Sequence, residues 1–133
     1  MNRRFLMLAL IGTLAGLSAA AGAPAWAHHS FAMYDSNKLI TVNATVKEFQ
    51  WTNPHAILLI VTGPNGSAPV QEWSIELPTS PGNLTRLGWT KHSLKPGDRI
   101  QLDFNPLRDG ALGGSFKKAT VAETGQVLTV NLK

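Results

Sequence analysis

The chain has 133 residues, enough for one domain, with a formal net charge of +4 and no cysteine. The lack of cysteine excludes a disulfide framework and a thiolate metal site. The positive charge is too mild and too scattered to predict a nucleic-acid-binding surface. Stability must therefore come from the hydrophobic core alone.

Residues 1–27 have the parts of a secretory signal peptide. Arg3 and Arg4 form a positive n-region, residues 5–17 are apolar, and residues 25–27 (AWA) fit the small-residue cleavage rule. A membrane anchor is the alternative, but Gly12, Thr13 and Gly16 interrupt an apolar run that should reach about 20 residues in a spanning helix. We predict cleavage after Ala27, with Ala23 as the rival site.

Cleavage after Ala27 leaves a single domain, residues 28–133, with a net charge of +2. Export places this domain in the periplasm or outside the cell. We therefore expect no nucleic-acid partner and no membrane anchor after cleavage.

The first strand is predicted from residue 40, where apolar side chains alternate with polar ones up to Val46. Phe49 and Trp51 then carry the apolar face on odd instead of even numbers. One extra residue near Lys47-Glu48 explains this slip and predicts a β-bulge. A strand bent in this way can help to close a barrel.

The next segments indicate two more strands. Residues 52–55 (TNPH) form a turn, because Pro54 disfavours a helical conformation at Asn53. Residues 56–61 are a continuous apolar run, and residues 63–69 are rich in turn-forming types. Strand three is predicted over residues 70–77, with Trp73, Ile75 and Leu77 on one face.

A short helix interrupts the strands. Ser80 can cap a helix that begins at Pro81 and ends at Gly88. Residues 95–98 (KPGD) form a tight turn before strand four at residues 99–105. Residues 105–114 are predicted as a long glycine-rich loop, followed by strands at 115–123 and 127–132.

The order of these elements matches an all-β, OB-like barrel, closed or partly open, with one short helix between strands three and four. A small β-sandwich with an irregular connection is the alternative.

Four histidines could carry chemistry: His28, His29, His55 and His92. Cleavage after Ala27 makes His28 the N-terminal residue, and its α-amine has a pKa near 8, low enough to ligate a metal. The amine and the ring of His28, with one further imidazole, would form a histidine brace, a nitrogen set that suits Cu(II).

The further imidazole would come from His29 or His55. If strands one and four pair antiparallel, His55 and His92 could be neighbours. Met33, Tyr34 and Trp51 are accessory candidates, with Trp51 shielding the ion. The ordinary alternatives are a surface role for His28, His29 and His92, and for His55 a hydrogen bond to a loop carbonyl.

Other patterns have simpler explanations. Trp73 and Trp89 are predicted core residues, the latter plugging the end of the barrel. Residues 108–110 (RDG) are best explained as a solvated loop. No enzyme signature is present, so we predict no catalytic residues.

Four motifs in order cover nearly the whole mature chain: HHSF at residue 28, WTNPH at 51, LKPGD at 94 and NPLRDG at 105. Together they resemble the uncharacterised family DUF6152 of small exported bacterial proteins. The resemblance implies export and one β-rich domain, and it supplies no activity. The architecture is more loosely similar to periplasmic OB-fold copper chaperones, although only Met33 remains here of their methionines.

Copper binding is the leading hypothesis, with His28, His29 and His55 as ligands. The alternative is a metal-free OB-type module that binds a small ligand or a protein partner through residues 105–114 and the barrel face. A copper-brace redox enzyme is the third hypothesis, disfavoured because a short chain offers few residues around the ligands.

Overall fold

The first long strand, β1 (Ile40–Gln50), bends where the sequence predicts a bulge. In the computed structural model, which describes residues 31–63 and 69–131, β1 pairs antiparallel with β4 (Arg99–Pro106) through its first half. Its second half pairs antiparallel with β2 (Ile57–Thr62). The register shifts between Val46 and Glu48, so Lys47 is the extra residue.

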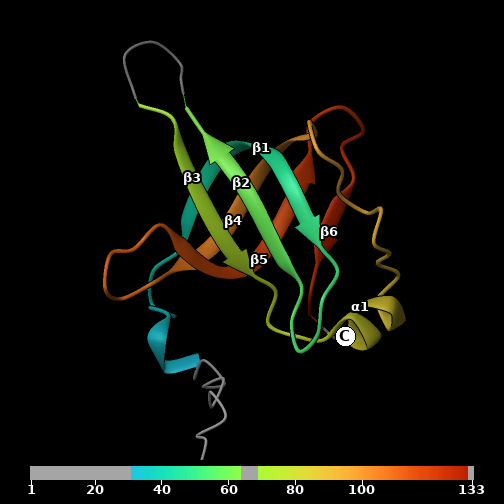
Figure 1. Cartoon of the computed structure of the whole chain (residues 1–133), viewed down its shortest axis with the longest axis horizontal. Helices are drawn as coiled ribbons and strands as arrows, with labels where there is room; N and C mark the ends of the chain where they lie inside the picture. Colours follow the sequence, from blue (N-terminus) through green and yellow to red (C-terminus); the bar gives the residue numbers. More distant parts are fainter. Residues whose placement is uncertain (1–30, 64–68, 132–133) are drawn as a thin grey trace, which may run out of the picture.

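The other strands close the sheet on itself (Figure 1). Strand β2 pairs antiparallel with β3 (Gln71–Glu76), and β3 pairs in parallel with β5 (Gly113–Val121). Strand β5 returns antiparallel to β4, which completes a five-stranded barrel in the order β1-β2-β3-β5-β4. A short strand, β6 (Val127–Thr129), extends the sheet beside β5. The predicted OB-like barrel is confirmed.

One short helix, α1 (Pro81–Arg86), lies between β3 and β4 as predicted. The backbone N–H of Asn83 donates to Oγ of Ser80 at 3.4 Å, and Pro81 occupies the first turn. Gly88 has a φ of 88°, a left-handed conformation that glycine adopts without strain. A 3-10 turn, η1 (Phe31–Met33), precedes the barrel.

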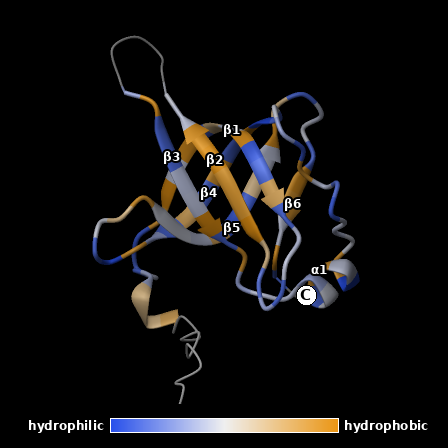
Figure 2. Cartoon of the chain, viewed as in Figure 1, coloured by the Kyte–Doolittle hydropathy of each residue, from blue (hydrophilic) through white to orange (hydrophobic). Residues whose placement is uncertain are grey.

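The core follows the alternation of the strands. Figure 2 shows β2 as a largely apolar ribbon, in keeping with the continuous run predicted there. Trp89 is 2% exposed, packs edge-on against Phe116, and donates its indole N–H to the Thr129 carbonyl at 2.8 Å. Trp73 is half-buried against Phe104. Both tryptophans therefore pack with the core, as predicted.

The loop between β4 and β5 is shorter than predicted, because Gly113 and Gly114 belong to β5. A Cβ on Gly114 would lie 2.3 Å from the Phe104 ring and 2.5 Å from the Asn105 carbonyl oxygen. Because they have no side chain, these glycines let β5 lie close to its neighbouring strands. In the sequence alone, two adjacent glycines indicate a loop. The last strand also ends early, at Thr129 instead of residue 132.

The predicted signal peptide, its cleavage site at Ala27, and both His28 and His29 lie outside the described residues. Within the described part, no helix has the length and apolar character needed to cross a membrane.

Candidate functional site at the mouth of the barrel

Three polar side chains from distant parts of the sequence meet at one end of the barrel. Glu76 is the last residue of β3, His55 lies in the turn before β2, and Tyr34 follows η1. The Tyr34 hydroxyl donates to Oε2 of Glu76, and Nδ1 of His55 is bonded to Oε1. One carboxylate therefore joins the other two groups, and we call these residues the Tyr-Glu-His cluster.

The Tyr-Glu-His cluster is largely shielded from water. Tyr34 is 8% exposed, and the side chains of Glu76 and His55 are 18% and 28% exposed. Burial, followed by the hydrogen bond and the negative charge of Glu76, raises the pKa of Tyr34 well above its usual range. The phenol therefore stays protonated and acts as a donor.

Both oxygens of Glu76 are thus hydrogen-bonded. A carboxylate only accepts, so we assign the His55 proton to Nδ1, which leaves Nε2 as a free acceptor. The ring does not bond a loop carbonyl, the ordinary role considered for it. Instead, the carbonyl of His55 accepts from Oγ1 of Thr52 at 3.0 Å across a turn in which the Asn53–Pro54 peptide is cis.

Residues 31–38, which we call the strap, are fastened to the end of β4 and the loop after it. The backbone N–H of Asp35 donates to the Pro106 carbonyl at 2.8 Å, and that of Arg108 donates to Met33 at 2.9 Å. The Asn105 side chain donates to the carbonyl of Lys38 at 2.6 Å. In Figure 1 the strap accordingly runs beside the β4–β5 loop. This attachment fixes Tyr34 against Glu76.

Arg108 contributes to the attachment of the strap. Its Nε donates to the Ala32 carbonyl at 3.0 Å, and its guanidinium lies 3.8 Å from the Asp35 carboxylate. The side chain is 53% exposed, in agreement with the predicted solvated loop. The sequence did not predict its contacts with Ala32 and Asp35.

A pocket of ≈ 870 Å³ opens beside the Tyr-Glu-His cluster. It lies between the β1–β2 turn, the β4–β5 loop and the strap, over the β2–β3 face. Its apolar lining is Met33, Pro54, Ile57, Leu107 and Leu112, and its polar lining includes His55, Glu76, Tyr34, Ser74 and Thr52. OB-fold proteins bind their ligands at the corresponding loops and strands.

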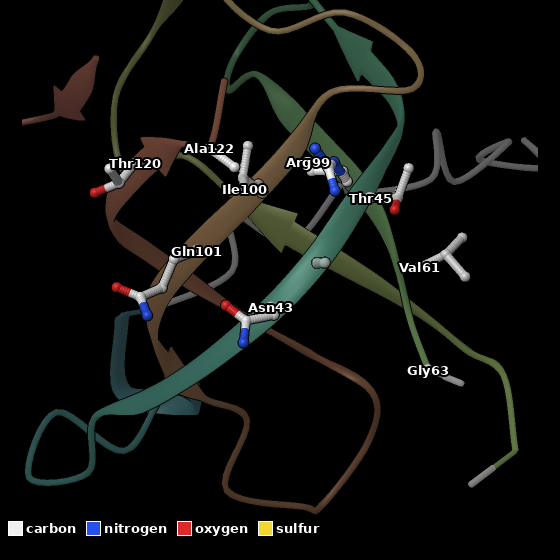
Figure 3. Close-up of a pocket in the computed structure, with 10 residues that line it drawn as sticks. Asn43, Thr45, Val61, Gly63, Arg99, Ile100, Gln101, Thr120 and Ala122 are labelled. Carbon is white, nitrogen blue, oxygen red and sulfur yellow. The ribbon is translucent and has the colours of Figure 1, made fainter. Parts of the chain in front are cut away.

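A second cavity, of ≈ 510 Å³, lies on the outer face of β1 and β4 (Figure 3). Asn43 and Gln101 are cross-strand partners there, as are Thr45 and Arg99. In Figure 3 these side chains stand on the outside of the sheet. The described residues that line this cavity include no acid–base pair and no buried polar side chain, so it is the weaker candidate.

The structure brings some of the other predicted site residues to the pocket and not others. Met33 and Tyr34 line it with His55, whereas Trp51 packs edge-on against Phe49, with ring centroids 5.7 Å apart. Trp51 is not among the residues that line the pocket, and its shielding of an ion stays a prediction.

The structure also does not bring His92 to His55. The exposed His92 lies in a turn, where its backbone N–H donates to Thr90 at 3.1 Å. The starts of β2 and β4 face different residues of β1, Gln50 and Thr45, because each strand pairs with a different half of the bent β1. The described residues contain no group of three or more His, Cys, Asp or Glu side chains that could hold a metal.

Glu76 is the site residue that sequence reasoning missed. Its neighbours Ile75 and Leu77 belong to the apolar face predicted for strand three, so the alternation puts Glu76 on the opposite face. Only the long-range meeting of the strap and the β1–β2 turn encloses it. The sequence offered one signal for Glu76, a carboxylate at the end of a predicted strand. This signal is weak, because only the topology shows that residues 34 and 55 lie beside it.

The fold and the pocket define a small OB-like barrel with a hydrogen-bonded cluster beside a pocket at one end. The chain belongs to the Family of unknown function (DUF6152), whose model matches residues 16–117. This match confirms the family suggested by the four motifs. No curated protein matches the chain.

Among solved structures, the chain is similar to the mitochondrial single-stranded DNA-binding protein Rim1 from S. cerevisiae. The TM-score is 0.52 at 10% identity, covering 67% of this chain and 97% of that chain. The likeness supports the OB-like fold. It also contradicts the prediction of no nucleic-acid partner, because a protein named for binding single-stranded DNA has a similar barrel. A mild net charge was insufficient ground for that exclusion.

Proposed function

We propose that this chain is an exported, non-enzymatic protein that binds copper at the mouth of the barrel. The ligands are the N-terminal amine and ring of His28 after cleavage at Ala27, together with His55, while His29 is the alternative donor. The single observation that carries this proposal is the bond between Nδ1 of His55 and the partly buried Glu76.

A hydrogen bond from a histidine ring to a carboxylate is common among histidines that bind metals. Metal-binding histidines commonly donate their other ring N–H to a carboxylate, which fixes the tautomer and makes the ligating nitrogen more basic. Glu76 does this for His55, and Tyr34 holds the second carboxylate oxygen. Nε2 of His55 is then the nitrogen available to an ion.

The strap supports the second part of the proposal. It carries the chain to the pocket, with Met33 and Tyr34 in the pocket lining. Phe31 follows His28 by three positions in the sequence, and this length of chain spans at most about 11 Å. The proposal requires that the amine and ring of His28 reach the pocket over this length of chain. Nitrogen ligands in a tetragonal set favour Cu(II) over the other common divalent ions.

The test is a Cu(II) titration of two purified forms, one beginning at His28 and one with a Met retained before it. We expect the form beginning at His28 to bind one ion at least about 10-fold more tightly, because only its amine and ring can chelate together. Electron paramagnetic resonance should show nitrogen ligands. Equal affinity of the two forms would overturn the proposal, as would intact mass showing that the exported chain begins elsewhere.

Two variants sharpen this titration. His55→Phe should weaken Cu(II) binding and reduce the number of nitrogen ligands. His92→Phe is the matched control, since His92 is exposed in a turn away from the pocket lining, and it should bind as the wild type does. An unchanged affinity in His55→Phe would remove this residue from the site.

A second candidate is a metal-free binding module that uses the same pocket. The position of the pocket favours this candidate, because it lies between the loops with which OB-folds bind oligonucleotides and oligosaccharides. A single-stranded oligonucleotide belongs in the test, given the name of the structural neighbour. Amide shifts confined to residues 52–57 and 107–114, with no metal present, would support this candidate.

A further inference from the structure

We propose that the pocket at the mouth of the barrel binds an uncharged aromatic alcohol. Its hydroxyl would donate to Nε2 of His55, and its ring would lie against the apolar wall. This inference refines the second candidate function. It needs neither copper nor any residue before Phe31.

The size and lining of the pocket fit a small organic molecule. Its volume of ≈ 870 Å³ falls within the range of about 300–1,000 Å³ in which small-molecule sites usually lie. Such sites are mostly apolar with a few placed polar groups. Here the wall comes from Met33, Ile57, Leu107 and Leu112, and a methionine thioether makes favourable contacts with aromatic rings.

The charges of the pocket select a neutral ligand. None of the described residues that line it is a lysine or an arginine, so an anion has no partner there. Glu76 is the carboxylate of the lining, and both of its oxygens already accept hydrogen bonds from Tyr34 and His55. A cation would compete with these two donors. An ionised ligand of either sign would thus lose water without gaining a free counter-charge.

The polar group of the ligand is set by His55. With Nδ1 engaged by Glu76, the ring offers one acceptor, Nε2, and the part of the chain that the structure describes supplies no partner for it. A hydroxyl is a neutral donor that can pair with this acceptor. The pocket lining includes Pro54 and Leu112, and apolar contact of a ring with these side chains would supply the remaining affinity.

The experiment compares three probes of nearly equal size: 2-naphthol, naphthalene and 2-naphthoate. Each is titrated in EDTA into the form with a Met before His28, so that copper binding plays no part. Binding is followed by amide shifts. We expect 2-naphthol to bind at least about 10-fold more tightly than naphthalene, since it alone makes the hydrogen bond, and 2-naphthoate to bind most weakly. The shifts should cluster in residues 52–57 and 107–114.

Variants separate the hydrogen bond from the apolar wall. His55→Phe should abolish the preference for 2-naphthol while naphthalene still binds, and His92→Phe should behave as the wild type. Leu112→Asp should weaken both probes, and because Leu112 is 41% exposed this change should leave the fold intact.

Equal binding of 2-naphthol and naphthalene, tighter binding of 2-naphthoate, or no binding at all would overturn the inference. Shifts centred on the outer face around Asn43 and Arg99 would do the same. The copper proposal would survive each of these outcomes, because its titrations use a different form of the protein and a different ligand.

Discussion

Asp103 of β4 joins three strands on the outer face of the barrel. Oγ1 of Thr41 in β1 donates to it at 2.7 Å, and Nζ of Lys118 in β5 lies 3.1 Å away. The Thr41 hydrogen bond is the main cause that lowers the pKa of Asp103. Burial opposes this shift, and Lys118 lowers the pKa further. The ionised carboxylate is therefore favoured in the folded state.

Thr41→Val removes the larger of these two stabilising contacts. At pH 7 we expect the free energy of unfolding to fall by about 1.5–3 kcal/mol, as for a hydrogen bond to a charged group. A lowered folded-state pKa contributes stability above the ordinary value of about 4, and this is lost as the pH falls through the folded pKa. The difference from wild type should thus shrink at pH 3.

Urea unfolding at pH 7 and pH 3 measures the effect of Thr41→Val. Thr45→Val is the matched control: Thr45 is an exposed threonine of the same strand whose hydroxyl has no bond to another described residue. The control should change stability little at either pH. Equal destabilisation by Thr41→Val at both pH values would contradict the role given to Asp103.

At the scale of the elements, the antiparallel pairing of β4 with β5 depends on the absence of a side chain at Gly114. A Cβ there would meet the Phe104 ring at 2.3 Å and a backbone oxygen at 2.5 Å, and the backbone cannot simply turn aside. We expect Gly114→Ala to lower the free energy of unfolding by about 3 kcal/mol through overpacking. Thermal or urea unfolding measures this directly.

Gly82→Ala provides the comparison for Gly114→Ala. Gly82 lies in α1, and its Cβ would approach Oγ of Ser80 no closer than 3.9 Å. Alanine should there be neutral or stabilising by about 0.5–1 kcal/mol, because it reduces the flexibility of the unfolded chain. A loss of stability as large as that of Gly114→Ala would mean that the close approach is not the cause.

Local patterns predicted most elements because their causes are local. The bulge at Lys47 appears as a change in the phase of apolar residues, and the cap at Ser80 as a serine before a proline. The glycines of β5 have a distant cause, the Phe104 ring, and were assigned to a loop. Glu76 was missed for the same reason, since its partners come from residues 34 and 55. Neighbouring residues in the sequence give no information about contacts between segments that are far apart in the chain.

At the scale of the whole molecule, the strap connects the start of the described chain to the far end of β4. Arg108 holds it through exposed contacts to Ala32 and Asp35, which contribute about 0–1 kcal/mol to stability. If the N-terminal amine binds copper at His55, the same contacts raise its effective concentration there. Arg108→Gln should thus lower Cu(II) affinity of the form beginning at His28 by about 5-fold, with little change in unfolding.

Arg86→Gln is the control for Arg108→Gln, because Arg86 is exposed and its guanidinium bonds only within the α1 region, to Asn83. It should leave copper affinity unchanged. The form with a Met before His28 should be insensitive to both substitutions. A loss of affinity in that form would show that Arg108 acts through general stability instead of through the strap.

The parallel contact between β3 and β5 also governs how the chain can fold. It joins Ser74–Glu76 to Gly113–Ser115, so closure must wait until segments some forty residues apart have met. Contacts of such long sequence separation slow the search for the native state, and until they form, the inner edge of β3 stays open to pairing with other chains. A chain in which β5 has not yet docked is thus prone to aggregate, and faster docking of β5 would protect the protein until the barrel closes.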